Sequence, residues 1–319
     1  MGLRLRVRQQ AWEQAVHACA EQFPGLIPVV KGNGYGFGRP ALMAVAASLA
    51  DLIAVGTVFE AGDVPADRTV VVLTPHLGEL PRSAPLTVVL TIGSLDHVHS
   101  LPTHHWQRRV VVKLQSSMRR YGVEPRDLEA LAAAARAADC TITGYALHFP
   151  LVGTSLGHMD EVEQWLPLLD PDLPVALSHL DVLTYGRLIA RHPGRTFHIR
   201  CGTALWIGDK SALQLSADVL DVHPARADDT VGYRGVRVPS DGHVVLVAAG
   251  SSHGVRPLPD GRSPFHFARE RVHLIEPSHM HTSMLFVPAG QPCPVVGDRV
   301  DVQCPLILTT ADEVEWVRD

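Results

Sequence analysis

A lysine that follows a predicted buried strand, at the start of a glycine-rich loop, is the residue in this sequence best placed for chemistry. The largely apolar residues 25–30 predict a short strand, and Lys31 comes directly after it. Glycine occupies every second position from 32 to 38, which gives the loop backbone freedom and little side-chain bulk. A lysine at the mouth of a pocket loses solvation, which lowers its pKa and favours Schiff-base chemistry. A solvated surface lysine is the alternative interpretation.

Composition excludes several classes of function. The 319 residues are 46% hydrophobic and 19% charged, which is typical of a globular protein large enough for a barrel and a smaller domain. The net charge of -5 and the pI of about 6.4 do not indicate a nucleic-acid partner. The sequence contains no run of about 18 apolar residues, so we expect no membrane span. Five cysteines without a CxxC pair, and an N-terminal stretch unlike a signal peptide, predict a cytoplasmic protein with reduced thiols.

Strands and helices alternate over the first two thirds of the chain. Arginines alternating with apolar residues at positions 4, 6 and 8 predict an initial strand. Eight further apolar runs predict strands at 26–30, 52–55, 69–73, 87–90, 110–114, 143–147, 174–177 and 197–200, with helices that include 12–22, 41–50, 125–138 and 159–169. Eight strands separated by helices or loops predict a (β/α)8 TIM-like barrel; a doubly wound open sheet is the alternative.

The pattern changes after residue 215. Prolines, glycines and short β-branched runs replace the helical periodicity, and strands are predicted at 242–248, 271–275, 283–287 and 298–302. We therefore predict two domains, the barrel over residues 1–215 and a C-terminal β-rich domain over residues 216–319.

Four segments, in sequence order, carry a resemblance to a known family. Residues 31–38, Lys-Gly-Asn-Gly-Tyr-Gly-Phe-Gly, resemble the lysine loop of the alanine racemases. These are pyridoxal-phosphate enzymes of fold type III that pair an N-terminal barrel with a C-terminal β domain. The resemblance implies that Lys31 forms the Schiff base with the cofactor and that Tyr35 lies at its phosphate. Phe37 replaces a histidine that is usual in the family.

The second and third segments add residues around the cofactor ring. Residues 112–122 resemble the family's Asp-Thr-Gly-Met-x-Arg-x-Gly loop, with Gln-Ser in place of Asp-Thr. This match implies that Arg120 lies near the phenolic oxygen, and Lys113 matches a lysine that is carbamylated in some members. Residues 144–149 resemble the strand whose histidine lies against the pyridine ring, which implies that role for His148. The nearby residues 177–180 align with a phosphate-binding strand end, and that role falls to Ser178 or His179.

The fourth segment implies a characteristic electronic environment. Residues 200–208, Arg-Cys-Gly-Thr-Ala-Leu-Trp-Ile-Gly, resemble the family's Arg-Pro-Gly-Ile-x-Leu-Tyr-Gly. Arg200 would then face the pyridine nitrogen, and the backbone of Gly202 and Thr203 would hold the phosphate. An arginine opposes protonation of that nitrogen, and the resulting weaker electron sink favours removal and return of a proton.

The resemblance is weakest for the residue that should face Lys31 across the substrate. Racemisation needs a base on each face of Cα, and the family's second base is a tyrosine of the C-terminal domain. Ser251 stands at that position, and a serine without an adjacent base is a poor proton carrier near pH 7. The nearest titratable residue, His253, is our candidate for the second base, and a structural histidine in an exposed turn is the alternative.

From this resemblance we predict a pyridoxal-phosphate-dependent amino-acid racemase that interconverts L- and D-amino acids. By analogy with the family we also expect a homodimer whose C-terminal domain completes the substrate site, and no metal ion. Two alternatives stay open. A D-threonine-aldolase-like lyase would hold a divalent metal through a His-x-Asp pair, which the spacing of His279 and His281 approaches. The protein would otherwise bind pyridoxal phosphate without racemase activity.

Overall fold

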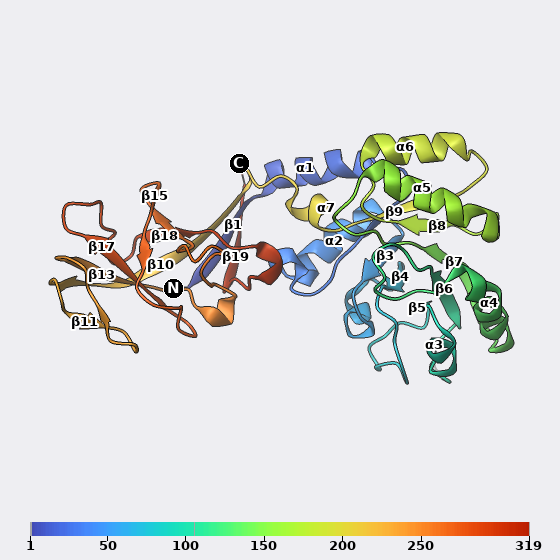
Figure 1. Cartoon of the computed structure of the whole chain (residues 1–319), viewed down its shortest axis with the longest axis horizontal. Helices are drawn as coiled ribbons and strands as arrows, with labels where there is room; N and C mark the ends of the chain where they lie inside the picture. Colours follow the sequence, from blue (N-terminus) through green and yellow to red (C-terminus); the bar gives the residue numbers. More distant parts are fainter. Residues whose placement is uncertain (1, 105, 319) are drawn as a thin grey trace. The chain divides into compact units, whose positions relative to one another are not determined.

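A computed structural model describes residues 2–104 and 106–318, and the chain divides into two compact units (Figure 1). The barrel unit contains Val16–Gly32 and Arg39–Gly208. The β unit contains the residues up to Ala15, the segment Asn33–Gly38 and the residues from Asp209 onward. The chain therefore contributes its first strand and part of the lysine loop to the β unit.

The barrel unit is built on eight parallel strands: β2 (Leu26–Pro28), β3 (Leu52–Val55), β4 (Thr69–Val72), β5 (Val89–Ile92), β6 (Arg109–Lys113), β7 (Thr141–Ala146), β8 (Val175–Leu177) and β9 (Phe197–Cys201). They follow the order β2-β9-β8-β7-β6-β5-β4-β3. A parallel bridge between Val29 and Ala54 joins β2 to β3 and closes the sheet. The predicted (β/α)8 TIM-like barrel is confirmed, and the open-sheet alternative is wrong.

Helices connect the barrel strands: α1 (Gln9–Glu21), α2 (Arg39–Leu49), α3 (Leu95–His99), α4 (Leu128–Ala137), α5 (Ser155–Trp165), α6 (Val182–Arg191) and α7 (Thr203–Ile207). Figure 1 shows α4, α5 and α6 on the outside of the strands. Side chains cap several of these helices; Thr154 accepts from Gly157 N and Asp181 accepts from Thr184 N. Among the described residues, 3-10 turns lie in the barrel unit at η2 (Val58–Asp63), η3 (Pro125–Asp127) and η4 (Leu166–Leu168), and in the β unit at η1 (Gly34–Gly36), η5 (Ser251–His253) and η6 (Leu306–Leu308).

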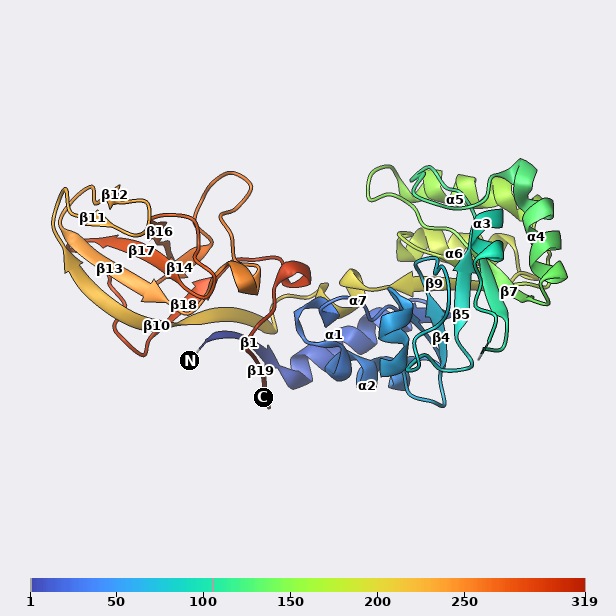
Figure 2. The same cartoon turned by 90° about the horizontal axis from the view of Figure 1, so that it is seen from below.

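The β unit is built on a nine-stranded sheet, which confirms a C-terminal β-rich domain: β1 (Leu3–Arg8), β10 (Leu213–Ala225), β13 (Gly242–Val247), β14 (Phe265–Phe267), β15 (Glu270–Arg271), β16 (His273–Leu274), β17 (Ser283–Pro288), β18 (Arg299–Val302) and β19 (Glu313–Val317). The path runs β15-β14-β18-β10-β13-β17-β16, and β1 pairs with β10 and β19. Figure 2 shows the long β10 beside β13. A separate hairpin joins β11 (Thr230–Val231) to β12 (Val236–Arg237).

The predicted initial strand is confirmed as β1. Its apolar residues Leu3, Leu5 and Val7 are fully buried, and the intervening arginines lie on the opposite face, as the period of two in a strand requires. β1 is antiparallel to β10 and parallel to β19, so two distant segments of the chain cover its two edges.

An aromatic cluster packs inside the β unit. The Trp12 and Phe37 ring centroids lie 5.2 Å apart, Trp12 and Trp316 also lie 5.2 Å apart, and Phe37 stacks on Trp316 at 6.0 Å. Trp12 and Phe37 are almost completely buried. Phe37, at the position where the racemase resemblance expects histidine, is therefore a core residue of this unit.

Within the described ranges, none of the helices combines the length and the apolar character that crossing a membrane requires.

Candidate active site

The C-terminal ends of the barrel strands carry most of the predicted site residues. Parallel strands end on one side of a barrel, where barrel enzymes have their active sites. Lys31 follows β2, Arg120 lies in the loop after β6, and Arg200 is the fourth residue of β9. The remaining members of this group directly follow strands β7, β8 and β9: His148, Ser178, His179, Gly202 and Thr203. The structure thus brings eight of the predicted residues to one end of the barrel unit.

Lys31 has a lowered pKa. The Lys31 side chain is exposed to solvent, yet nearby protein atoms partly desolvate its amine. This desolvation is the largest cause of the lowered pKa. The positive charge of Arg120 lowers the pKa further, the negative charge of Glu60 raises it, and Arg200 lowers it again. A larger fraction of the amine is therefore unprotonated near neutral pH than for an ordinary lysine, which favours nucleophilic attack and proton transfer.

Two charged residues hold the peptide that follows Lys31. Glu60 in η2 accepts from Gly32 N at 2.9 Å with one carboxylate oxygen and from Gly56 N at 2.7 Å with the other. On the other side, Arg39 donates to Gly32 O at 2.8 Å and pairs with Asp63 at 2.5 Å. Both polar groups of the Gly32 backbone are thus fixed. Glu60 is not among the site residues predicted from the sequence, although Thr57 and Glu60 form a Thr-x-x-Glu capping box that marks the start of η2.

Replacing Glu60 by glutamine should lower the Lys31 pKa further, because the change removes the negative charge that raises it. The amide oxygen of glutamine accepts from only one of the two backbone N–H groups, and its NH2 group faces the other as a second donor, so the loop should loosen. The pH dependence of Lys31 acylation, measured by mass spectrometry with an amine-reactive reagent, should shift to lower pH. Glu129→Gln, at an exposed position on α4, is the control and should leave the profile unchanged. An unchanged profile for Glu60→Gln would exclude this charge effect.

His148 is held as a neutral imidazole. Its Nδ1 shares a 2.8 Å hydrogen bond with the hydroxyl of Ser178, and its ring lies 4.8 Å from that of His179. Burial lowers the His148 pKa to about 2, with further lowering from Arg200, then His179, Lys113 and Arg120. Ser178 is fully buried and also accepts from Phe149 N, whereas His179 is exposed.

The neutral state of His148 predicts a dependence of stability on pH. In the unfolded chain its pKa is about 6.5, and in the folded protein about 2, so the unfolded state binds the proton more tightly. This contribution to stability is full above pH 6.5 and is lost as pH falls below it, by at most about 1.4 kcal/mol per pH unit. Denaturant unfolding of His148→Asn should therefore show a shallower loss between neutral and acidic pH than the wild type. His17→Asn, on the exposed face of α1, should keep the wild-type slope.

Arg200 occupies the interior of the barrel. Its guanidinium donates to Leu147 O and, at 3.4 Å, to Leu177 O, which fixes its position between β7, β8 and β9. Burial lowers the Arg200 pKa to about 10, which still leaves it cationic at neutral pH. The residue also lines a small cavity of about 60 Å³ inside the barrel.

Positive charge dominates this end of the barrel. Lys113 is buried, donates to Ala146 O at 3.3 Å, and has its pKa lowered well below the ordinary value by burial and then by Arg200 and Arg120. The same arginines lower the pKa of Lys31. Clustered cations repel one another, and an anionic ligand such as a phosphate balances their charge. An unprotonated amine among them can form a Schiff base with an aldehyde. The residues therefore fit a cofactor that carries both an aldehyde and a phosphate.

Tyr35 and His253 belong to the β unit. Tyr35 is buried in η1 with a left-handed φ of 55°, in the segment that Asn33 ties to Leu306 O and Thr309 O. His253 Nδ1 accepts from Gly250 N at 3.0 Å, and Nε2 lies 3.1 Å from Asp312. Both nitrogens of this buried ring are therefore engaged.

The two other histidines considered from the sequence also have partners. His279 Nε2 lies 2.6 Å from Glu276, and His281 Nδ1 hydrogen-bonds Ser252 at 3.1 Å. Among the residues that the structure describes, no group of three or more His, Cys, Asp or Glu residues is arranged to hold a metal ion.

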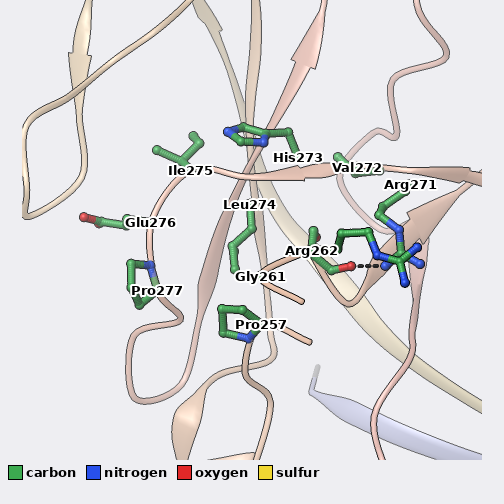
Figure 3. Close-up of a pocket in the computed structure, with 11 residues that line it drawn as sticks. Pro257, Gly261, Arg262, Arg271, Val272, His273, Leu274, Ile275, Glu276 and Pro277 are labelled. Carbon is green, nitrogen blue, oxygen red and sulfur yellow. Dashed lines mark hydrogen bonds between the residues drawn. The ribbon is translucent and has the colours of Figure 1, made fainter. Parts of the chain in front are cut away.

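The β unit contains a cavity of about 430 Å³ (Figure 3). The loop around Arg262 and the strands near Arg271 and His273 line it, with Glu276 and Pro277 at one end. None of the predicted site residues lies in its wall, so its size does not make it the centre of the predicted chemistry.

Comparison with known protein families gives one decisive match. The model of the alanine racemase N-terminal domain matches residues 7–206. The chain belongs to the alanine racemase family. This membership assigns it pyridoxal phosphate as its cofactor and places it among racemase-like enzymes, and the barrel-end residues described above fit that cofactor.

Solved structures of racemases share the fold of this family member. The alanine racemase of Bartonella henselae with covalently bound pyridoxal phosphate is 15% identical, with a TM-score of 0.72 over 96% of this chain and 91% of that chain. The alanine racemase of the D-cycloserine producer Streptomyces lavendulae is 18% identical, with a TM-score of 0.73 over 100% and 98%. The histidine racemase of Leuconostoc mesenteroides subsp. sake is 18% identical, with a TM-score of 0.69 over 99% and 97%. No curated protein matches the sequence.

Proposed function

We propose that this protein is a pyridoxal-phosphate-dependent amino-acid racemase that interconverts L- and D-amino acids through a Schiff base on Lys31. The observation that carries the proposal is the lowered pKa of the Lys31 amine at the cation-rich end of a family barrel. Such an amine both bonds an aldehyde and moves a proton near neutral pH. The resemblance of residues 31–38 to the family's lysine loop supports the same assignment.

One group of residues is proposed to bind the phosphate of the cofactor. Tyr35, Ser178 or His179, and the backbone of Gly202 and Thr203 are the proposed phosphate ligands, by their match to the family. The full burial of Ser178 and its bond to His148 favour the more exposed His179 for a direct contact.

The ring-side residues set the electronic character of the site. When bound, pyridoxal phosphate supplies an electron-withdrawing ring that stabilises negative charge at the substrate Cα. Arg200 remains cationic and opposes protonation of a ring nitrogen that faces it, and neutral His148 adds no charge. By its match to the family, Arg120 supplies a positive charge beside the phenolic oxygen of the cofactor. Lys31 takes or returns the Cα proton on the D-substrate face.

His253 stays our proposal for the base on the other face. The reason for this proposal is that serine, and not tyrosine, occupies position 251. Both ring nitrogens of His253 already have partners, Gly250 N and the Asp312 carboxylate. The neutral ring accepts at Nδ1 and donates from Nε2 to Asp312, so one of these hydrogen bonds must open before His253 carries a substrate proton. We also propose a cytoplasmic homodimer, by analogy with the family.

The proposed racemase leaves open which amino acid is its substrate. One structural neighbour acts on alanine by its description and another on histidine, at equal identity to this chain, so the fold supports substrates of different size. The lyase alternative gains no support, because His279 and His281 already pair with Glu276 and Ser252.

Exchange of the Cα hydrogen with solvent deuterium tests the racemase proposal. The reconstituted protein should catalyse exchange from both enantiomers of its amino-acid substrate and yield a racemic product. Exchange from one enantiomer with retained configuration would contradict racemisation. Cleavage of a β-hydroxy amino acid with added divalent metal, in place of exchange, would instead establish the lyase.

Replacing His253 by alanine should remove most exchange from one enantiomer, by about 10²–10⁴-fold, while exchange from the other enantiomer persists. A change in the ratio of the two rates separates proton transfer from a structural effect, because loss of the Gly250 and Asp312 contacts lowers both together. His223→Ala, at an exposed position on β10 of the same unit, is the matched control. Full racemisation by the His253 variant would remove this residue from the mechanism.

A further inference from the structure

Two arginine side chains extend toward the same end of the β-unit cavity of about 430 Å³ (Figure 3). Arg262 comes from the loop after Pro257, and Arg271 is the last residue of β15. Pro257, Leu274 and Pro277 contribute apolar side chains to the wall. Small-molecule sites have volumes of about 300–1,000 Å³ and combine apolar walls with a few fixed polar groups. The cavity therefore has the size and the composition of a binding site.

The backbone and the side chain of Arg262 are both held in place. Leu258 N donates to Arg262 O at 2.8 Å, and Gly261 N donates to Leu258 O at 2.8 Å, which closes a tight loop. Gly261 has a φ of 81°, a conformation that favours glycine. Asp260 accepts from Arg262 Nε at 2.6 Å and pairs with Nη2 at 2.5 Å. Within the described part of the chain, Arg262 Nη1 has no hydrogen-bond partner.

Arg271 is fixed in a similar manner. Its Nη1 donates to Ser263 O, and its Nη2 donates to Gln303 Oε1 at 3.1 Å. Its Nε has no partner among the residues that the structure describes. Each arginine thus keeps one donor nitrogen for a ligand, while its other nitrogens hold the guanidinium in position. Donors that are already positioned lose less conformational entropy when a ligand binds.

The charges around the cavity favour an anion with a single negative charge. The two guanidiniums carry two positive charges, and Asp260 balances one of them. The carboxylate of Glu276, in the cavity wall, accepts from Tyr233 N at 2.9 Å and Arg234 N at 3.0 Å and lies 2.6 Å from His279 Nε2. Figure 3 shows this carboxylate pointing away from the two arginines. One positive charge at the arginine end is therefore available to a ligand.

We propose that this cavity binds a small monocarboxylate with a short apolar body. One carboxylate oxygen accepts from Arg262 Nη1 and the other from Arg271 Nε, and the apolar body packs against Leu274 and the two prolines. Hydrogen bonds between arginine and a carboxylate are charge-assisted and stronger than those between neutral groups, so the carboxylate determines most of the specificity. None of the predicted cofactor-site residues lines this cavity, so this ligand binds independently of the proposed racemase chemistry.

Isothermal titration calorimetry of the cofactor-loaded protein with isovalerate tests the site. Isovaleramide, which has the same shape and no charge, is the matched control ligand. We expect saturable binding of isovalerate, much weaker binding of isovaleramide, and no change in the absorbance of the cofactor. Equal binding of the two ligands, or no saturable binding of isovalerate, would overturn the proposal. A change in cofactor absorbance at saturation would place the ligand in the barrel unit and would also contradict it.

Replacing Arg262 by glutamine should weaken isovalerate binding by about 10- to 100-fold, because the change removes a charged hydrogen-bond donor to the carboxylate. The Arg262 side chain is 62% exposed, so the unfolding midpoint should stay at the wild-type value. Arg126→Gln replaces another exposed arginine that pairs with acidic residues, in η3 of the barrel unit, and should keep wild-type affinity. Unchanged affinity in Arg262→Gln would show that the ligand does not bind between these arginines.

Valine adds an ammonium group to the isovalerate skeleton and thereby separates amino acids from simple carboxylic acids as ligands. Cofactor-loaded protein reduced with borohydride is used for this comparison, so that the amino acid does not exchange onto the cofactor. We expect valine to bind more weakly than isovalerate, because its ammonium would lie beside two guanidiniums. Valine binding as tightly as isovalerate would contradict the proposed monocarboxylate site.

Discussion

Replacing Lys31 by alanine should abolish exchange of the substrate Cα hydrogen, with a loss of at least about 10³-fold, and should prevent covalent retention of pyridoxal phosphate. The sequence has only three lysines, at positions 31, 113 and 210, so few side chains compete for the aldehyde. Lys113 is buried, and Lys210 is an exposed residue after α7. Only Lys31 combines exposure with a lowered pKa at the barrel end. General base catalysis by one group contributes about 10²–10⁴-fold, and the covalent link adds to it.

The matched control for this change is Lys210→Ala, which should keep wild-type exchange rates and cofactor content. Lys31→Arg should behave like Lys31→Ala, since a guanidinium does not form the Schiff base and does not deprotonate near neutral pH. Exchange and reducible cofactor in Lys31→Ala at wild-type levels would contradict the proposed mechanism.

Replacing Trp12 by alanine should lower the free energy of unfolding of the β unit by about 3–5 kcal/mol, the range for truncating a buried tryptophan or phenylalanine. Trp12 is 1% exposed and contacts both Phe37 and Trp316. Its removal would leave a void between the segment that follows the site lysine and the last strand. Circular dichroism in a denaturant series measures the change, with the two units fitted separately if they unfold in separate transitions.

Phe59→Ala provides the control for the loss of an aromatic ring. Phe59 is 71% exposed in η2, and its truncation should change the stability by no more than about 0.5 kcal/mol. Trp12→Phe should retain part of the packing and fall between the wild type and Trp12→Ala. An unchanged unfolding midpoint in Trp12→Ala would show that the aromatic cluster does not stabilise this unit.

The barrel could be predicted because each of its strands is marked by a local run of apolar residues. The apolar run at residues 52–55 predicted β3 with its observed bounds, and the neighbouring strands differ from their predictions by a few residues. The pairing of β1 with β10 and β19 could not be predicted, because it joins residues more than 200 positions apart and no local pattern encodes that contact.

In the site, too, local sequence patterns predicted individual residues but not the contacts that distant segments make with them. The glycine loop pointed to Lys31, whereas the charges that tune its pKa come from Glu60, Arg120 and Arg200 in separate segments. His253 was selected for its position near Ser251. Its bond to Asp312, 59 residues later, depends on tertiary packing that the sequence alone does not display.

Borohydride reduction of the reconstituted protein, followed by peptide mapping, tests the central claim most directly. The protein is loaded with pyridoxal phosphate, freed of excess cofactor, reduced and digested, and the mass of each lysine-containing peptide is measured. We predict a reduced cofactor adduct on Lys31, with Lys113 and Lys210 unmodified. An adduct confined to Lys113 or Lys210, or no adduct on any of the three lysines, would contradict the account.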